Sequence, residues 1–192
     1  MRSLILVMHT SLDGFVAGPK GEMGWIIVDD ELFEYGGKFT DRADSALYGR
    51  VTYQMMESYW PKAADKPSAT KHDIEHSRWY NSVSKIVLSR TLQQSSLTNT
   101  TILADNIPQR IKDIKQENGR DILMFGSPSA AHTLTQHNLI DDYLLFVNPV
   151  ILGSGIPLFA GIRERKQLRL LSARAFSSGV AGLHYQRKTG NT

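Results

Sequence analysis

Short runs of apolar residues, separated by polar and glycine-rich segments, set the pattern of this chain. The run Ile-Leu-Met-Phe at 122–125 carries no alternating polar positions, which is typical of a strand buried on both faces of a parallel sheet. The last two runs are joined by Ser177-Ser178-Gly179, which predicts an antiparallel hairpin. We expect strands at residues 3–8, 45–48, 85–88, 101–103, 122–125, 143–147, 168–176 and 183–187.

Apolar residues between these strands recur at helical spacing. Asp29 or Asp30 can cap one helix, and Ser127 followed by Pro128 is a typical helix start, because proline at the first helical position loses no hydrogen bond. The segment 59–72 is polar and interrupted by proline, which predicts a surface loop. Helices are expected over about 29–39, from 49, around 74–80, over 106–119 and over 127–138.

Strands and helices therefore alternate through most of the chain, which then ends in a hairpin. This order predicts one α/β domain over residues 1–192, built on a central mixed sheet flanked by helices. The centre of the sheet is expected to be parallel and its C-terminal hairpin antiparallel. Ligands of such sheets bind at the carboxyl ends of the parallel strands.

Three predicted strand ends carry residues suited to a phosphorylated ligand: Arg50 with Thr52, Ser89 with Arg90, and Gly126-Ser127. A Gly-Ser turn that opens a helix directs free N–H groups and the positive helix end at one spot. A guanidinium suits the extra ribose phosphate of a phosphorylated dinucleotide. No G-x-G-x-x-G follows the first strand, and an ordinary α/β turn without a ligand remains the alternative.

Composition narrows the classes of protein. The chain has 192 residues and no cysteine, which excludes disulfides, thiolate catalysis and cysteine-ligated zinc. The net charge is only +3 and basic residues are not interleaved with aromatic ones, so no nucleic-acid partner is expected. The apolar run after Met1-Arg2 is too short for a signal peptide or a membrane span, so we expect a cytoplasmic protein without a membrane partner.

One motif points to a different chemistry. Residues 72–76 read His-Asp-Ile-Glu-His, the inverted zinc-protease pattern H-x-x-E-H. A zinc site would need both histidines on one helix face and a third ligand. Because the segment lies in or beside a polar loop, we interpret the match as chance and expect no metal site; a zinc hydrolase stays open as an alternative that metal analysis would test.

Several motifs carry a resemblance to a known family: SLDGFVAGP at 11–19, LYGRVTY at 47–53, KIVLSRTL at 85–92, FGSPSAAHTL at 125–134 and LIDDYLLFVNPVILGSGIPLF at 139–159. The chain resembles the dihydrofolate-reductase-like superfamily, most closely stand-alone proteins related to the reductase half of the riboflavin-biosynthesis deaminase-reductase. The motifs span nearly the whole chain in the family's order. The resemblance implies a three-layer dihydrofolate-reductase-like fold, NADPH as cofactor, a small-molecule substrate and a homodimer.

The resemblance also implies a role for each cofactor-binding residue. Arg50, in the sequence Gly49-Arg50, would bind the ribose 2′-phosphate of NADPH, with Ser89 and Arg90 beside it. Thr52 would meet the pyrophosphate from its helix N-terminus. The residues implied to cradle the other side of the pyrophosphate are Gly126, Ser127, Pro128 and Ser129, and those implied to line the same cleft are Gly153 and Gly155.

Two departures from the family bear on the substrate. Phe125 stands where the riboflavin reductases carry an acidic residue that holds the substrate. Folate reductases carry a carboxylate on the helix after a loop tryptophan, and Asp30 is the acid closest to that spacing after Trp25. Asp13 and Asp30 are therefore the candidate proton donors or relays, with plain turn or N-cap roles as the alternative.

These observations predict an NADPH-dependent reductase of a small heterocyclic substrate, resembling 5-amino-6-(5-phosphoribosylamino)uracil reductase. Two alternatives stay open. One is a dihydrofolate-reductase-like enzyme with a different pteridine or carbonyl substrate, and the other is a non-catalytic NADPH-binding protein.

Overall fold

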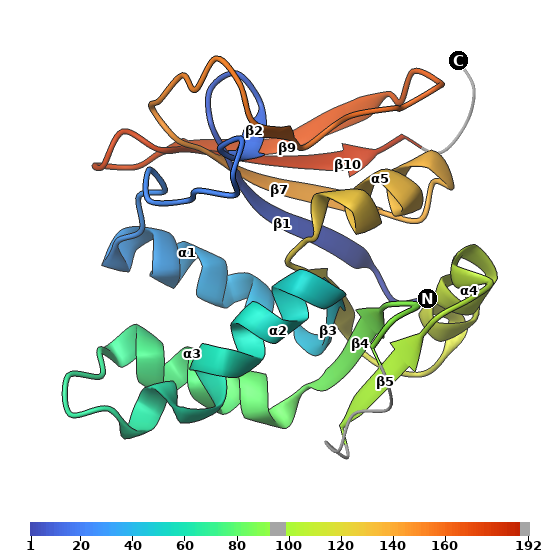
Figure 1. Cartoon of the computed structure of the whole chain (residues 1–192), viewed down its shortest axis with the longest axis horizontal. Helices are drawn as coiled ribbons and strands as arrows, with labels where there is room; N and C mark the ends of the chain where they lie inside the picture. The colour runs from blue at the N-terminus through green and yellow to red at the C-terminus, as the bar shows by residue number, and fades with distance from the viewer. Residues whose placement is uncertain (93–98, 189–192) are drawn as a thin grey trace.

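The computed structural model describes residues 1–92 and 99–188, and an eight-stranded sheet runs through them (Figure 1). Its strands lie in the order β5-β4-β3-β6-β1-β7-β10-β9. Neighbours from β5 to β7 are parallel, whereas β10 runs antiparallel to both β7 and β9. The strands are β1 Leu4–Thr10, β3 Ala43–Gly49, β4 Ser84–Leu88, β5 Thr100–Leu103, β6 Asp121–Met124, β7 Asp142–Val147, β9 Leu168–Ala175 and β10 Ala181–Arg187.

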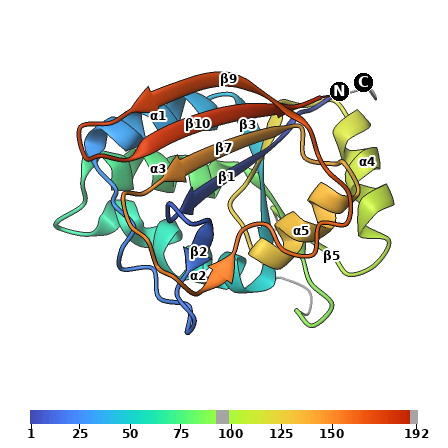
Figure 2. The ribbon, with the colours of Figure 1, turned by 90° about the horizontal axis from the view of Figure 1, so that it is seen from above.

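Helices cover both faces of this sheet and make three layers. On one face lie α1, α2, the short 3-10 helix η1 and α3, and on the other lie α4 and α5 (Figures 1 and 2). The helices are α1 Asp30–Thr40, α2 Arg50–Tyr59, η1 Trp60–Asp65, α3 Lys71–Ser82, α4 Ile107–Gln116 and α5 Pro128–Gln136. No described helix is long and apolar enough to cross a membrane.

Side chains alternate between the two faces along each central strand, as the period of an extended chain requires. In β1, Leu4 and Leu6 join the core under α4 and α5, whereas Ile5 packs on the α1 side. In β6, Met124 joins the core under α4 and α5, and Leu123 packs on the α1 side. The central strands are therefore buried on both faces, which is why their sequences are apolar throughout. The predicted fold, a mainly parallel mixed sheet ending in an antiparallel hairpin, is confirmed.

Two short strands lie outside the predicted pattern. β2 (Phe15–Ala17) pairs antiparallel with β8 (Ile156–Pro157), and together they form a separate two-stranded sheet. Elements of three and two residues are too short for hydrophobic periodicity to reveal them. Their pairing brings the loop after β1 against the loop after β7, although the two segments are far apart in sequence.

The prediction of a surface loop over 59–72 is wrong for much of that segment. η1 occupies Trp60–Asp65, and α3 already begins at Lys71. Pro61 lies in the first turn of η1, where its missing N–H leaves no bond unmade. Thr70 caps α3 in a capping box with Asp73, a start signal that the sequence reading overlooked.

Candidate active site

A groove of about 540 Å³ lies at the carboxyl edge of the sheet, where β3, β4 and β5 end and α2, α4 and α5 begin. It brings together six of the eleven residues predicted to bind the cofactor. These six are Gly49, Arg50, Ser89, Arg90, Ser127 and Ser129.

Gly49 and Ser127 lie against each other at the centre of this edge. The Gly49 N–H donates to the Gly126 carbonyl oxygen at 3.0 Å. A Cβ atom on Gly49 would overlap Ser127 Oγ and would lie 3.1 Å from Ser127 N. Gly126 adopts a φ of +95°, a region that favours glycine, and its peptide bond to Ser127 is cis. Glycine at both positions therefore allows the turn before α5 to lie directly on the end of β3.

The three helices whose first residues line the groove share an uncapped N-terminus. Gly49, Asn106 and Ser127 are the N-cap residues of α2, α4 and α5, and none of their side chains accepts a capping hydrogen bond. By contrast, Asp29 caps α1 and Thr70 caps α3, both away from the groove. The groove is thus bordered by three positive helix ends that no side chain caps, an arrangement suited to a bound anion.

Two guanidinium groups add positive charge to the groove. Both side chains are exposed; Arg50 donates from one nitrogen to Gln54 Oε1 at 2.9 Å, and Arg90 makes no side-chain hydrogen bond in the described part of the chain. Ser89 Oγ accepts the N–H groups of Thr91 and Leu92, which holds the turn that carries Arg90. Both arginines therefore keep donors available for a phosphate.

The remaining cradle residues lie beside the groove. Thr52 is in the first turn of α2, and its Oγ1 would be 3.4 Å from a Cβ atom on Gly126. Pro128 occupies the first position of α5, as predicted, and Ser127 Oγ shares a hydrogen bond with Ser129 Oγ at 3.0 Å. Ser127 thus occupies the N-cap position without capping, because its hydroxyl bonds to Ser129 rather than to a backbone N–H.

Gly153 and Gly155 do not line the groove. Gly153 N donates to Asp13 Oδ2 at 2.8 Å, and a Cβ atom on Gly155 would overlap the Ala17 carbonyl oxygen. Both glycines therefore allow the loop between β7 and β8 to pack on the loop after β1. Their predicted contact with the cofactor stays a prediction.

Asp13 ties these same two loops together. Its carboxylate accepts hydrogen bonds from Ser11 Oγ at 2.7 Å and from the backbone N–H groups of Leu152 and Gly153. These bonds lower the pKa of Asp13, with the Ser11 hydroxyl as the largest cause. The side chain is exposed, and its ionised form is the favoured one, which suits a loop anchor better than a proton donor.

Asp30 is exposed at the first position of α1, while Asp29 takes the cap role by accepting the N–H of Leu32 at 2.8 Å. The Asp30 carboxylate lies close enough to His72 to favour the charged imidazole electrostatically. Asp30 thus borders the face of the sheet that α1 and α3 cover. Its catalytic role stays a prediction.

The histidines of the H-x-x-E-H motif pack against aromatic rings. His72 stacks on Phe33 with ring centroids 3.4 Å apart, and His76 lies 4.1 Å from Trp60 and 5.2 Å from Trp79. Over residues 1–92 and 99–188, no group of three or more His, Cys, Asp or Glu side chains is placed to hold a metal ion.

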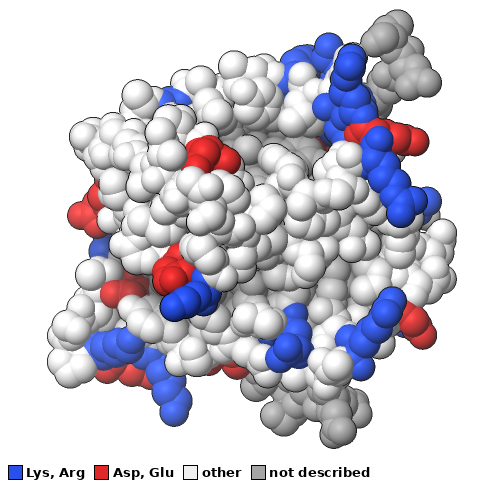
Figure 3. Space-filling view, turned by 45° about the horizontal axis from the view of Figure 1, so that its top comes forward, with Lys and Arg blue, Asp and Glu red and all other residues white. Residues whose placement is uncertain are grey.

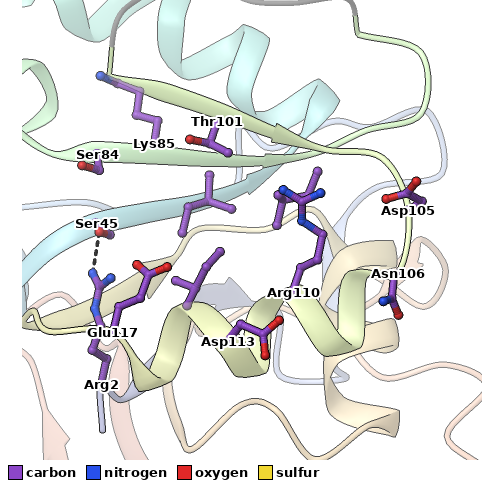
Figure 4. Close-up of a pocket in the computed structure, with 13 residues that line it drawn as sticks. Arg2, Ser45, Ser84, Lys85, Thr101, Asp105, Asn106, Arg110, Asp113 and Glu117 are labelled. Carbon is purple, nitrogen blue, oxygen red and sulfur yellow. Dashed lines mark hydrogen bonds between the residues drawn. The ribbon is translucent and has the colours of Figure 1, made fainter.

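A larger groove, of about 880 Å³, runs along α4 beneath β3, β4 and β5 (Figure 4). Arg110 points into it from α4, and Arg2 at the other end donates to Ser45 Oγ. Arg2 also pairs with Asp44, and the carboxylates of Asp113 and Glu117 line the same groove. None of the predicted site residues lines this groove, and the uncapped starts of α2 and α5 lie elsewhere. We therefore place the candidate site in the smaller groove.

Some residues of the smaller groove escaped the sequence analysis. Asp105 and Asn106 come two and three residues after the end of β5, Thr133 lies on α5, and His137 is the C-cap residue of α5. The signal for the first pair was available, because they too stand at the carboxyl end of a parallel strand. Charged side chains on the face shown in Figure 3 lie mostly around its rim and form no continuous basic surface there.

The sheet order, the helices on both faces and this groove define a protein of the dihydrofolate-reductase-like fold. The structure superposes on dihydrofolate reductase from Enterococcus faecalis with a TM-score of 0.64, at 12% identity and 97% coverage of both chains. It also superposes on a pyrimidine reductase-like protein from Corynebacterium diphtheriae with a TM-score of 0.68, at 15% identity and coverage of 98% and 93%.

Within this fold the chain belongs to the RibD C-terminal domain family, which matches residues 2–181. The uncharacterized Bacillus subtilis protein YyaP is 35% identical over 190 residues, which cover 96% of this chain and 94% of YyaP. The family is one of NADPH-dependent reductases. The family assignment is thus confirmed.

Proposed function

We propose that the protein is an NADPH-dependent reductase of a small heterocyclic substrate. The observation that carries the proposal is the groove itself, where three uncapped helix N-termini and two guanidinium groups surround one space. A dinucleotide with an additional phosphate presents anionic groups that these donors can satisfy together.

The residues fit the cofactor part by part. Arg50 and Arg90 would hold the ribose 2′-phosphate, with Ser89 fixing the turn that carries Arg90. The start of α5 at Ser127 and Ser129, together with Thr52 on α2, would hold the pyrophosphate. NADPH would supply the hydride, and the chain would orient it and exclude water.

For the substrate, the family favours a pyrimidine such as 5-amino-6-(5-phosphoribosylamino)uracil. Phe125 argues for a different heterocycle, because it puts an aromatic ring beside the cradle in place of the acidic residue expected from the resemblance. A pteridine or another planar carbonyl compound is therefore the alternative substrate. We also propose a cytoplasmic location.

A non-catalytic NADPH-binding role is the second candidate. The bonded, ionised carboxylate of Asp13 favours it, because this side chain is a poor proton donor. Oxidation of NADPH in the presence of a candidate substrate separates the two roles, since a sensor would bind the nucleotide without consuming it.

Dimer formation is a further part of the proposal. β9 lies at the edge of the described sheet, and its Leu170 and Leu171 are 50% and 42% exposed. A second copy would cover these side chains. Light scattering after gel filtration should give twice the mass of one chain. Leu171→Asp should lower this measured mass toward that of a single chain.

Titration with NADPH and NADH tests the cofactor assignment. We expect wild-type protein to bind NADPH at least tenfold more tightly than NADH, and Arg50→Gln to lose about tenfold to a hundredfold of NADPH affinity, since a charged hydrogen bond contributes roughly 1.5–3 kcal/mol. Arg78→Gln, an exposed arginine on α3, is the matched control and should bind as wild type does. Failure of both nucleotides to bind would remove the reductase proposal.

A further inference from the structure

The turn between α4 and β6 contains Asn118-Gly119, the one Asn-Gly pair in the sequence. α4 ends at Gln116, and its C-cap residue Glu117 already has an extended backbone, with φ −63° and ψ 159°. Asn118 and Gly119 are both exposed and belong to no helix or strand. The pair therefore lies in an open connection, where solvent reaches its side chain and its backbone.

Neither reacting group of this pair has a hydrogen-bond partner. In the part of the chain that the structure describes, the Asn118 side chain makes no hydrogen bond and the Gly119 N–H donates none. Asparagine is a thermolabile residue, because its side-chain carbonyl carbon can be attacked by the nitrogen of the next peptide bond. Glycine in the next position favours the attack, since it has no side chain to shield that nitrogen or to restrict the backbone.

Two other asparagines of the described chain are held by hydrogen bonds. Asn81 precedes Ser82, but both residues belong to α3, and Asn81 Nδ2 donates to the Pro61 carbonyl oxygen at 3.1 Å. Asn99 Nδ2 donates to the carbonyl oxygens of Asn81 and Val83 at 3.3 Å and 3.0 Å. Their side chains must break these bonds before they can turn toward the next nitrogen. Asn118 has no such bond to break.

We propose that Asn118 is a site of spontaneous modification, at which water converts the asparagine into isoaspartate. Gly119 N forms a bond to Asn118 Cγ, the Cγ–Nδ2 bond breaks, and ammonia leaves with the proton that Gly119 N gives up. Water then opens the resulting succinimide ring. Cleavage between Gly119 N and the main-chain carbonyl carbon of residue 118 gives isoaspartate, and cleavage at Cγ gives aspartate. Nothing is oxidised or reduced, and the chain gains one negative charge.

Isoaspartate would lengthen the main chain in a closely packed place, because the chain then runs through Cβ and Cγ of residue 118. A Cβ atom on Gly119 would lie 2.9 Å from both Arg2 Nε and Asp44 Oδ2. The next residue is bound to the same two side chains: Arg120 N donates to Asp44 Oδ2 at 2.8 Å, and Arg2 Nε donates to the Arg120 carbonyl oxygen at 2.8 Å. The added atom must therefore displace Arg120 from these partners, which tie β6 to β3 and to the start of the chain.

The inference is independent of the proposed reductase function. None of the residues around this turn lines the smaller groove. The modification needs only water, and its effect is on the junction of α4 and β6. NADPH binding therefore neither supports nor contradicts it.

The first experiment follows the modification over time. The full chain is incubated folded, at physiological pH and temperature, and samples are digested for mass spectrometry and for an isoaspartyl methyltransferase assay. We expect Asn118 to convert at least tenfold faster than Asn81 or Asn99, with isoaspartate as the larger product. Asn118→Gln is the matched control, since it keeps the amide but would have to close a larger ring, and its methyltransferase signal should be at least tenfold lower. A folded chain in which Asn118 stays intact, or converts no faster than Asn81 and Asn99, would overturn the inference.

The second experiment measures the effect on the turn. The isoaspartate form is separated by ion exchange and compared with freshly prepared Asn118→Asp, which carries the same charge without the added main-chain atom. We expect the isoaspartate form to melt at least about 2 °C below wild type and Asn118→Asp to melt within about 1 °C of it. Equal melting temperatures of the isoaspartate form and wild type would overturn the predicted displacement of Arg120. Equal losses in both forms would assign the effect to the charge and overturn it as well.

Discussion

Ser127 rests directly on Gly49, so that the first turn of α5 and the end of β3 meet with no room for a side chain between them. One residue is the last of a strand, and the other begins a helix 78 positions later in the chain. This contact fixes the free N–H groups of α5 relative to Arg50, which follows Gly49. The geometry of this end of the groove therefore depends on the absence of a side chain at Gly49.

Gly49→Ala should weaken NADPH binding and also lower the unfolding free energy. The added methyl group must displace Ser127, and crowding of this kind costs about 1–3 kcal/mol of unfolding free energy. We expect NADPH affinity to fall by at least tenfold, measured by titration. Gly36→Ala is the control: no atom lies within 4 Å of its added Cβ, and alanine inside helix α1 should stabilise the protein by roughly 0.5–1 kcal/mol. Equal NADPH affinity in Gly49→Ala and wild type would contradict the prediction.

The local part of this site could be predicted from sequence, and the long-range part could not. Arg50, Ser89 and Ser127 each stand just after an apolar run, so their position at one sheet edge follows from strand patterning and parallel connection. The packing of Trp79 against Phe125 joins segments 46 residues apart, and no periodicity encodes it. Likewise, the Asp13 bonds to Leu152 and Gly153 depend on the β2–β8 pairing, which is too short to leave a pattern.

Asp13→Asn should loosen the junction between the loops after β1 and β7. The carboxylate accepts two backbone N–H groups there, and an amide replaces one of its acceptor oxygens with a donor. We expect faster hydrogen exchange at the Leu152 and Gly153 amides, read by mass spectrometry of the peptides that contain them. If NADPH oxidation falls without this change in exchange, Asp13 acts in proton transfer and not as an anchor. The exposed Asp41→Asn is the control for charge alone.

Lys115→Met should strongly lower the unfolding free energy, although Lys115 does not line the candidate site. Lys115 is 5% exposed, pairs with Asp141 and donates to the Leu139 carbonyl oxygen at 2.9 Å. Removing one partner of a buried pair leaves the other charge uncompensated and costs about 3–5 kcal/mol. Urea unfolding measures the loss, and the exposed Lys112→Met should change the unfolding free energy by less than about 0.5 kcal/mol. A loss below 1 kcal/mol in Lys115→Met would show that Arg187, which also pairs with Asp141, compensates that charge.

Stability should fall as the pH drops from about 6.5 to 4, and His9 should account for part of the loss. Burial lowers the pKa of His9 to about 4, so the folded chain holds a neutral ring that stacks on Phe146 with centroids 5.0 Å apart. Below the unfolded pKa of 6.5 the unfolded chain binds a proton that the folded chain refuses, and the unfolding free energy decreases until the folded pKa is reached.

The shift of His9 corresponds to about 3 kcal/mol between pH 7.5 and pH 4. In His9→Phe, this part of the pH dependence disappears. The unfolding free energies measured by urea at pH 7.5 and pH 4 should therefore lie about 3 kcal/mol closer together than in wild type. The exposed His137→Gln should keep the wild-type dependence. An unchanged dependence in His9→Phe would mean that the ring is protonated within the fold, with Asn148, 3.4 Å from its Nδ1, turned to offer its amide oxygen.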